Sequence, residues 1–307
     1  MTSGFNAFRP LTCLTIASLT LLSGCMQHSR SDTDEASGSY QRMEASTESQ
    51  SNSRVRHLVL HYTDDDLTGS LISLTGADVS AHYLLSAPAD GEALPRVYPL
   101  VSENRRAWHA GISQWGERGH LNDTSIGIEM VNAGPEALTP LAPGQTESRA
   151  SGVARRWSPD RHFAAWNEQQ IAALIALASP IVHRHDIKAV DVVGHSDIAP
   201  DRKTDPGPRF PWRRLHEAGI GAWPRDADVS CFRQQMASDG LPAEKTLIAA
   251  LAHYGYPVEA ERPWMAIAAF QAHFRPGAIS GQFDAESAAI LLALNMRYRQ
   301  STPCQAR

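Results

Sequence analysis

The segment Val190–Trp212, VDVVGHSDIAPDRKTDPGPRFPW, joins an apolar strand pattern to a histidine and a proline-rich loop. Its β-branched run ends at Gly194, and His195 follows directly. Asp205 stands further along, in a turn of the form Lys203-x-Asp-Pro-Gly. A strand that delivers an imidazole, followed by a turn that fixes a carboxylate, supplies part of a metal site. The remaining ligands must come from elsewhere in the chain.

Two other polar residues lie in apolar strand patterns. His61 ends the run HLVLH, where an open α/β sheet usually places its ligands, although a satisfied core histidine is equally compatible with the pattern. Glu129 lies inside IGIEMV, where a carboxylate is costly unless it is paired, coordinated or catalytic. The structural alternative for Glu129 is a salt bridge to a buried arginine.

Together, His61, His195 and Asp205 would form a catalytic zinc set with a fourth position left for water. Zinc would lower the pKa of that water and polarise a scissile carbonyl. Glu129 would then accept the proton, and Lys203 would stabilise the developing oxyanion. Asp197 is an alternative ligand. The sequence contains no His-Glu-x-x-His, Cys-x-x-Cys or Gly-x-Ser-x-Gly motif that would indicate another site.

The pattern of residues 54–223 predicts an α/β domain with a central mixed sheet flanked by helices. A helix should begin at Asn167, with Gln170 completing a capping box. Residues 135–161 are rich in Pro, Gly, Ser and Thr and predict a long surface loop, in which Trp157, Arg155 and Arg156 are solvated or touch substrate. The expected strands are His57–His61, Ala81–Ser86, Arg96–Leu100, Ile126–Val131 and Val190–Gly194.

Residues 231–304 predict a small all-α domain of three helices. They are expected over Ala243–Tyr254, from Pro263 onward, and after an Asp284 cap. Cys231 and Cys304 bracket this domain and would form a disulfide in an oxidising compartment, or else remain two free thiols.

The N-terminal residues are predicted to lie outside the fold. The apolar run from Leu11 to Leu22 fits a signal peptide over residues 1–24 and is too short to span a membrane. LSGC resembles the bacterial lipoprotein box, which implies lipidation of Cys25 and, with Met26 following, an outer-membrane lipoprotein facing the periplasm. The alternative is a buried core segment. Residues 25–53 are polar and predict a flexible tether.

Four segments together resemble zinc-dependent N-acetylmuramoyl-L-alanine amidases of the AmpD/AmiD-like type 2 family, most of all its outer-membrane lipoprotein type. They are VLHYT, RAWHAG, NDTSIGIEMVN and GHSDIAPDRKTDPGPRFPW. The resemblance implies one Zn²⁺ on His61, His195 and Asp205, with Glu129 as the catalytic carboxylate and Lys203 as the transition-state cation. FQAHFRP and GQFDAES are similar to the peptidoglycan-binding domain of such lipoproteins.

The expected reaction is hydrolysis of the amide between N-acetylmuramic acid and L-alanine in peptidoglycan or muropeptides. A non-catalytic peptidoglycan receptor and a zinc peptidase acting within the stem peptide remain alternatives. The net charge of −5 gives no indication of nucleic-acid binding, and we expect a monomer. The expected substrate contacts, each with a purely structural alternative, are His109, Asn122, His82 and Arg106.

Overall fold

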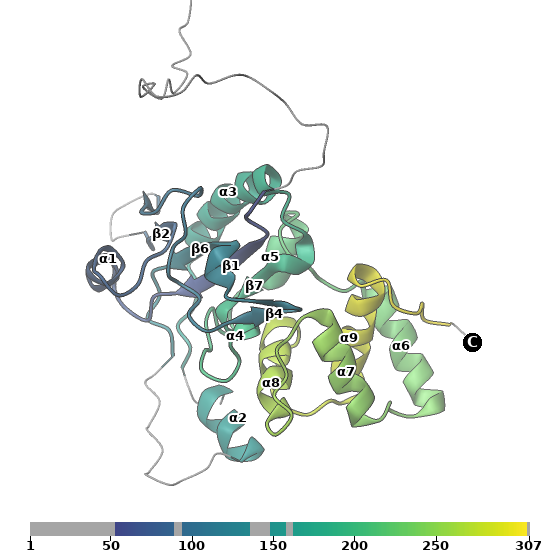
Figure 1. The fold of residues 1–307 in the computed structure, drawn as a ribbon. Coiled ribbons are helices and arrows are strands. Elements are labelled where there is room, and N and C mark those ends of the chain that lie inside the picture. Colours follow the sequence, from purple (N-terminus) through teal and green to yellow (C-terminus); the bar gives the residue numbers. More distant parts are fainter. Residues whose placement is uncertain (1–52, 89–93, 136–147, 158–161, 306–307) are drawn as a thin grey trace, which may run out of the picture. The chain divides into compact units, whose positions relative to one another are not determined.

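A computed structural model describes residues 53–88, 94–135, 148–157 and 162–305 of the chain, as an α/β domain followed by helices (Figure 1). The predicted signal peptide, Cys25 and nearly all of the predicted tether lie outside these residues, as do residues 136–147 and 158–161 of the predicted loop.

The central sheet is mixed, as predicted, with the strand order β3-β2-β6-β1-β7. β1 (His57–Tyr62) lies between β6 (Ser125–Met130) and β7 (Val192–Gly194) and is parallel to both. β2 (Tyr83–Leu85) is parallel to β6, and β3 (Val97–Pro99) is antiparallel to β2. The parallel strands therefore direct their carboxyl ends, where His61, Glu129 and His195 were predicted, toward one edge.

All five predicted strands are present, but several are shorter than expected. β7 pairs with β1 only from Leu58 to Leu60, so Val190 falls in a short 3-10 helix (Ala189–Asp191) before the strand. A second, two-stranded sheet, β4 (Gln114–Trp115) with β5 (Arg118–Gly119), was not predicted because each strand has only two residues.

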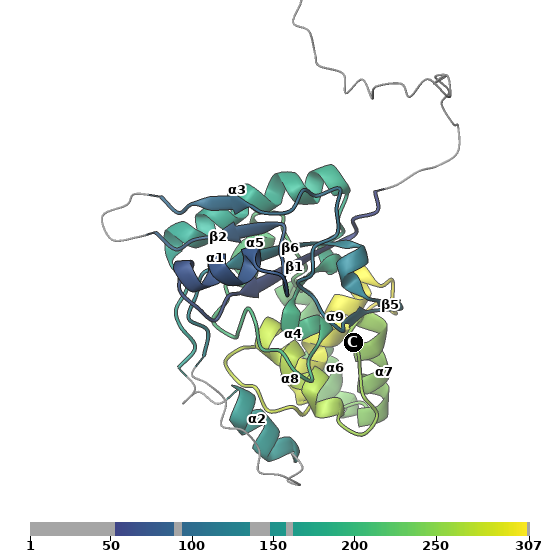
Figure 2. The same cartoon turned by 60° about the vertical axis from the view of Figure 1, so that its left-hand side comes forward.

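The two faces of the sheet have different partners, which Figure 2 shows above and below it. Leu58 and Leu60 pack in one apolar cluster with helices α3 (Glu168–His185) and α5 (Trp212–Glu217). Val59 belongs to a second cluster with C-terminal helices. Because side chains alternate along a strand, His61 shares the face of Val59. The site therefore lies on the face opposite α3.

The predicted start of α3 is confirmed, but the role of Gln170 is not. Asn167 accepts hydrogen bonds from the backbone N–H groups of Gln169 and Gln170. The Gln170 side chain does not return to the cap. It is buried and donates to the carbonyls of Val131 and Leu85, where two strands end against the helix.

The predicted long loop contains a helix, α2 (Arg149–Trp157), so this prediction is corrected. Trp157 and Arg156 are buried, and the ring of Trp157 stacks on Phe163. Gly152 lies so close to Trp264 that a Cβ there would come within 2.1 Å of its ring. Burial against another part of the chain stabilises α2 despite its polar sequence, and Trp157 is neither solvated nor available to substrate.

The C-terminal part has four helices rather than three. These form the helical module: α6 (Asp226–Asp239), α7 (Glu244–Tyr254), α8 (Pro263–Phe274) and α9 (Ala285–Tyr298). The missed helix, α6, has few apolar residues, and Phe232 and Met236 are buried in a cluster with residues of α7 and α9. Its first residue precedes the predicted boundary at Cys231. The predicted disulfide between Cys231 and Cys304 is confirmed.

The helical module shares one apolar cluster with the α/β domain. Trp115 of β4 contacts the rings of Tyr254 and Tyr256, and the N–H of Gly116 donates to the carbonyl of Gly255 at 2.7 Å.

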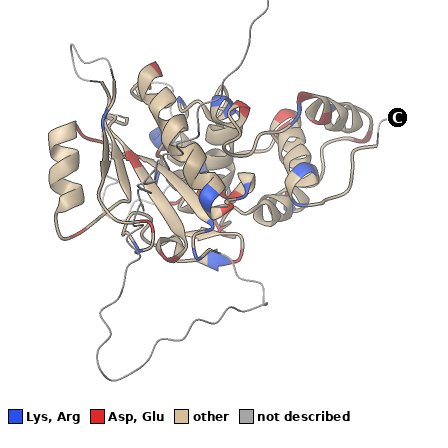
Figure 3. Ribbon diagram, turned by 90° about the horizontal axis from the view of Figure 1, so that it is seen from above, with Lys and Arg blue, Asp and Glu red and all other residues tan. Residues whose placement is uncertain are grey.

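Acidic and basic residues are interspersed over both parts (Figure 3). Within the described ranges, the helices are too short or too polar to cross a bilayer.

Candidate metal centre

Strand register brings His61 and Glu129 together. They are partners in the parallel pair β1–β6, and both point to the face opposite α3. His61 is almost completely buried, and its Nδ1 lies 3.8 Å from Oε1 of Glu129. Strand pairing thus brings together two residues that were predicted as site residues from separate sequence motifs.

His195 begins the short helix α4 (His195–Ile198), directly after β7. The loop that carries Asp205 folds back onto this turn, where the N–H of Ser196 donates to the carbonyl of Asp205 at 2.9 Å. Gly194 permits this approach, because a Cβ there would lie 2.6 Å from Cδ of Pro206. The Lys203-x-Asp-Pro-Gly turn therefore needs a glycine before His195.

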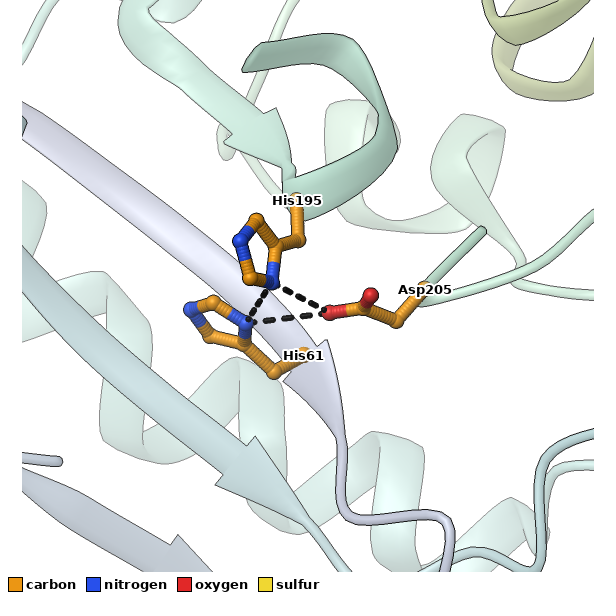
Figure 4. A group of neighbouring side chains, drawn as sticks. All are labelled: His61, His195 and Asp205. Atoms are coloured by element: carbon orange, nitrogen blue, oxygen red, sulfur yellow. Dashed lines mark hydrogen bonds and ion pairs between the residues drawn. The ribbon is translucent and has the colours of Figure 1, made fainter. Parts of the chain in front are cut away.

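Three potential ligand atoms converge at this edge of the sheet (Figure 4). Nδ1 of His61 lies 3.0 Å from both Nδ1 of His195 and Oδ2 of Asp205, and the last two atoms are 3.1 Å apart. Ligands of a tetrahedral zinc at about 2.1 Å lie roughly 3.4 Å from one another. The nearly equilateral triangle, slightly tighter than that, fits three ligands on one side of a small ion.

Hydrogen bonds on the far sides of both imidazoles leave Nδ1 free to coordinate. Nε2 of His195 lies 3.1 Å from the carbonyl oxygen of Ala110, which can only accept, so Nε2 carries the proton. Nε2 of His61 donates to Nδ1 of His109, and Nε2 of His109 donates to Oγ of Ser125. Such outer partners fix the tautomer and orientation of metal-ligating histidines.

The electrostatics of the three residues also suit a cation. Burial, and next the proximity of His195, lowers the pKa of His61 to about 4, so its ring is neutral. Burial alone would raise the pKa of Asp205, but the two histidines hold it well below its ordinary value. Two imidazole nitrogens and one carboxylate oxygen are a donor set that zinc prefers.

Glu129 differs from Asp205 in having few partners. Burial, and next the negative charge of Asp205, raises its pKa well above its ordinary value, while Lys203 opposes this shift. Oε2 of Glu129 is buried without a hydrogen bond from any described residue. The arginine salt bridge that was the structural alternative does not occur among the described residues. This carboxylate is therefore positioned to take up a proton.

The site opens into a cavity of about 460 Å³. Half-buried Lys203 lines it together with His61, Glu129, His195 and Asp205. Exposed Trp108 forms part of its rim. The cavity thus holds the five residues predicted for metal binding and catalysis, with Lys203 beside the three potential ligands.

Of the four residues predicted to contact substrate, one lines the cavity and three do not. His109 lines the cavity but is tied to His61, and Gly127 makes room for its ring. Asn122 is buried, and its Oδ1 accepts from the N–H groups of His109 and Ala110. It thus orients the segment behind His61 and His195, and its contact with substrate remains a prediction.

His82 requires a correction, since it is fully buried and does not line the cavity. Its Nδ1 accepts from the N–H of Gly127 and its Nε2 bonds the carbonyl of Arg105, so it joins β6 to a neighbouring loop. Arg106 is exposed, pairs with Asp123 and stacks over Trp108. A substrate contact by Arg106 remains a prediction.

Three site features were not identified from the sequence. They are the carbonyl of Ala110, the hydroxyl of Ser125, and Arg202, whose Nη2 donates to the carbonyls of Ala110 and Ile112. All lie within or beside the motifs RAWHAG, NDTS and PDRKTD, but a backbone carbonyl has no sequence signal. Asp197 is not a metal ligand in this arrangement, because its carboxylate bonds residues of the helical module.

Known proteins resemble this chain in both sequence and fold. Residues 51–208 match the family model Amidase_2, N-acetylmuramoyl-L-alanine amidase. Escherichia coli AmiD, an N-acetylmuramoyl-L-alanine amidase, is 43% identical over 80% of this chain and 84% of its own length.

Two solved structures resemble this one over nearly their whole length. The structure of Pseudomonas aeruginosa AmpDh3 in complex with anhydromuramic pentapeptide covers 87% of this chain and 99% of its own, at 41% identity and a TM-score of 0.70. That of E. coli AmiD with the substrate anhydro-N-acetylmuramic acid-L-Ala-D-γ-Glu-L-Lys covers 87% and 98%, at 40% identity and a TM-score of 0.72. The chain therefore belongs to the N-acetylmuramoyl-L-alanine amidase family.

Proposed function

We propose that this protein is a zinc-dependent amidase that hydrolyses the bond between the lactyl group of N-acetylmuramic acid and the L-alanine of a stem peptide. The observation that carries the proposal is the triangle of His61 Nδ1, His195 Nδ1 and Asp205 Oδ2, with Glu129 beside it in the same cavity. Zinc held by these atoms would polarise the amide carbonyl and acidify a water molecule.

Side chains of the protein transfer the proton and stabilise the negative charge of the oxyanion. Glu129 lies beside the three ligand atoms in the same cavity, and its buried Oε2 has no hydrogen bond from a described residue, so it accepts a proton from the attacking water and passes it to the departing amine of L-alanine. Lys203 lines the same cavity and compensates the negative charge that develops on the carbonyl oxygen. Ala110 and His109 hold the two imidazoles in orientation throughout.

The substrate class follows from the relatives. AmiD was solved with an anhydro-muramyl tripeptide and AmpDh3 with an anhydromuramic pentapeptide. A cavity of about 460 Å³ is within the range of small-molecule sites, so a muramyl-peptide fragment of peptidoglycan fits its size.

The protein's location and its attachment are also part of the proposal. Removal of residues 1–24 and lipidation of Cys25 would anchor it at the outer membrane, facing the periplasm, with residues 25–53 as the tether. The disulfide supports an oxidising compartment, since such bonds persist there. The helical module would bind cell wall, and the protein would act as a monomer. Acyl chains found by mass spectrometry on Cys25, and absent after Cys25→Ala, would support the anchor.

Mass spectrometry of digested muropeptides tests the reaction. The proposal expects free stem peptides that begin at L-alanine, loss of these products after treatment with EDTA, and their recovery with Zn²⁺. Products that retain part of the peptide on the sugar would indicate a peptidase. Tight muropeptide binding with no products would indicate a receptor.

A further inference from the structure

The helix that begins with His195 also carries Asp197, whose carboxylate points into the helical module. Asp197 is completely buried. Its Oδ2 accepts hydrogen bonds from the N–H of Gly194 at 2.7 Å and from Nδ1 of His273 at 2.8 Å. Its Oδ1 accepts from the hydroxyl of Tyr256 at 2.7 Å. One carboxylate thus joins the residue before His195 to two side chains of the module.

The two donors are themselves held in place. The ring of His273, in α8, stacks between those of Trp212 and Phe274, with centroids 3.8 and 3.9 Å away. Tyr256 is buried just after α7 and contacts Trp115 and Phe270. Burial, and next the charge of Asp197, raises the pKa of Tyr256 well above its ordinary value, so its hydroxyl remains a donor.

The turn that presents His195 has little stability of its own. α4 comprises four residues, and a helix that short does not persist without tertiary contacts. The bond from Asp197 to Gly194 closes its first turn, and the contacts of α4 with α8 cover it. The position of the His195 backbone therefore depends on a carboxylate whose other two partners belong to the helical module.

We propose that Tyr256 and His273 are positioning residues for the metal site, acting through Asp197 on the turn that projects His195. The helical module is then a structural part of the metal centre, whatever it binds outside it. This inference rests on the proposed function, because it assumes that His195 is a metal ligand. It goes further in giving a metal-positioning role to a part of the chain that contributes no ligand.

Competition with a chromophoric chelator measures the Zn²⁺ affinity of the full chain, and kcat, KM and the unfolding midpoint are measured on the same variants. Tyr256→Phe removes one bond to Asp197. His273→Leu removes the other, while His273→Asn keeps an amide donor close to the position of Nδ1. Tyr298→Phe is the matched control, since its hydroxyl bonds the backbone of Trp223 elsewhere between the module and the domain.

Tyr256→Phe and His273→Leu should each weaken Zn²⁺ binding by about tenfold. This is the lower end of the loss of metal affinity that follows removal of a residue that holds a ligand in place. Their kcat falls with little change in KM, His273→Asn recovers part of the affinity, and Tyr298→Phe binds Zn²⁺ like the wild type. Wild-type Zn²⁺ affinity in both Tyr256→Phe and His273→Leu, whatever happens to their unfolding midpoints, would overturn this positioning role. Failure of the wild-type protein to bind Zn²⁺ would instead overturn the proposed function.

Discussion

His61 and Glu129 occupy paired positions on the adjacent parallel strands β1 and β6, and their Nδ1 and Oε1 atoms lie 3.8 Å apart. Strand register therefore places the proposed proton acceptor beside a proposed metal ligand without any loop between them. Because β1 and β6 are both central strands, neither residue can shift without disturbing the core. This rigidity suits a reaction in which water must be held between a metal and a base.

Glu129→Gln should keep Zn²⁺ and lose most activity. The amide has nearly the same shape as the carboxylate but cannot accept the proton, and loss of a general base costs about 10²- to 10⁴-fold in rate. Inductively coupled plasma mass spectrometry measures the zinc content of the variant, and its kcat is measured on a muropeptide. Near wild-type turnover in a zinc-loaded Glu129→Gln protein would remove Glu129 from the mechanism.

His195→Ala should lose both the metal and the activity. Two of three ligands would remain, and the loss of affinity should exceed the roughly 10- to 100-fold that removal of an outer partner causes. His253→Ala, on the exposed side of α7, is the control for a histidine change that leaves the metal content intact. If both variants retain one zinc per chain, His195 is not a ligand.

Lys203→Met should retain Zn²⁺ but lower kcat by about a hundredfold, as removal of one oxyanion partner does in other hydrolases. Lys203→Arg keeps the positive charge and should recover part of kcat. Steady-state kinetics tests this role, because loss of an interaction made equally in the ground state and the transition state would raise KM and leave kcat unchanged.

Glu103→Gln tests an ion-pair network remote from the site. Glu103 pairs with Arg184 and His185 and accepts from the hydroxyl of Tyr83. Although burial opposes it, these partners lower its pKa to about 2, so the stabilisation is complete above the ordinary value near 4.5 and disappears as pH falls to about 2.

Urea unfolding should show the variant about 1 kcal/mol less stable near neutral pH, a modest value because Arg184 is half exposed. The difference should shrink progressively below about pH 4.5. A difference that stayed constant down to about pH 2 would mean that ionised Glu103 does not stabilise the fold.

Loss of the disulfide should destabilise the protein through its unfolded state. Cys231 and Cys304 are 73 positions apart, and a loop of that length corresponds to roughly 4 kcal/mol in the chain-entropy model. The double variant Cys231→Ala, Cys304→Ala should lose about that much in denaturant unfolding, and reduced wild-type protein should match it. Equal stability of the oxidised, reduced and double-variant proteins would contradict the prediction.

Much of the fold and the site could be predicted because the relevant signals are local. His61, Glu129 and His195 each follow or lie within a short apolar run, and the sheet aligns those runs. Helices α2 and α6 were missed because their sequences are polar and only partners distant in the chain bury them. The same reason applies to Asp197, an alternative ligand by its sequence position, because its partners Tyr256 and His273 are distant in the chain.

Digestion of a defined muramyl peptide in H₂¹⁸O, followed by mass spectrometry of both products, shows which bond is cut and which carbonyl the water attacks. Attack of water on the lactyl carbonyl predicts one ¹⁸O in the carboxylate of the muramic acid product and an unlabelled peptide with a free L-alanine amine. An ¹⁸O label in a peptide carboxylate, with L-alanine still attached to the sugar, would contradict the assignment.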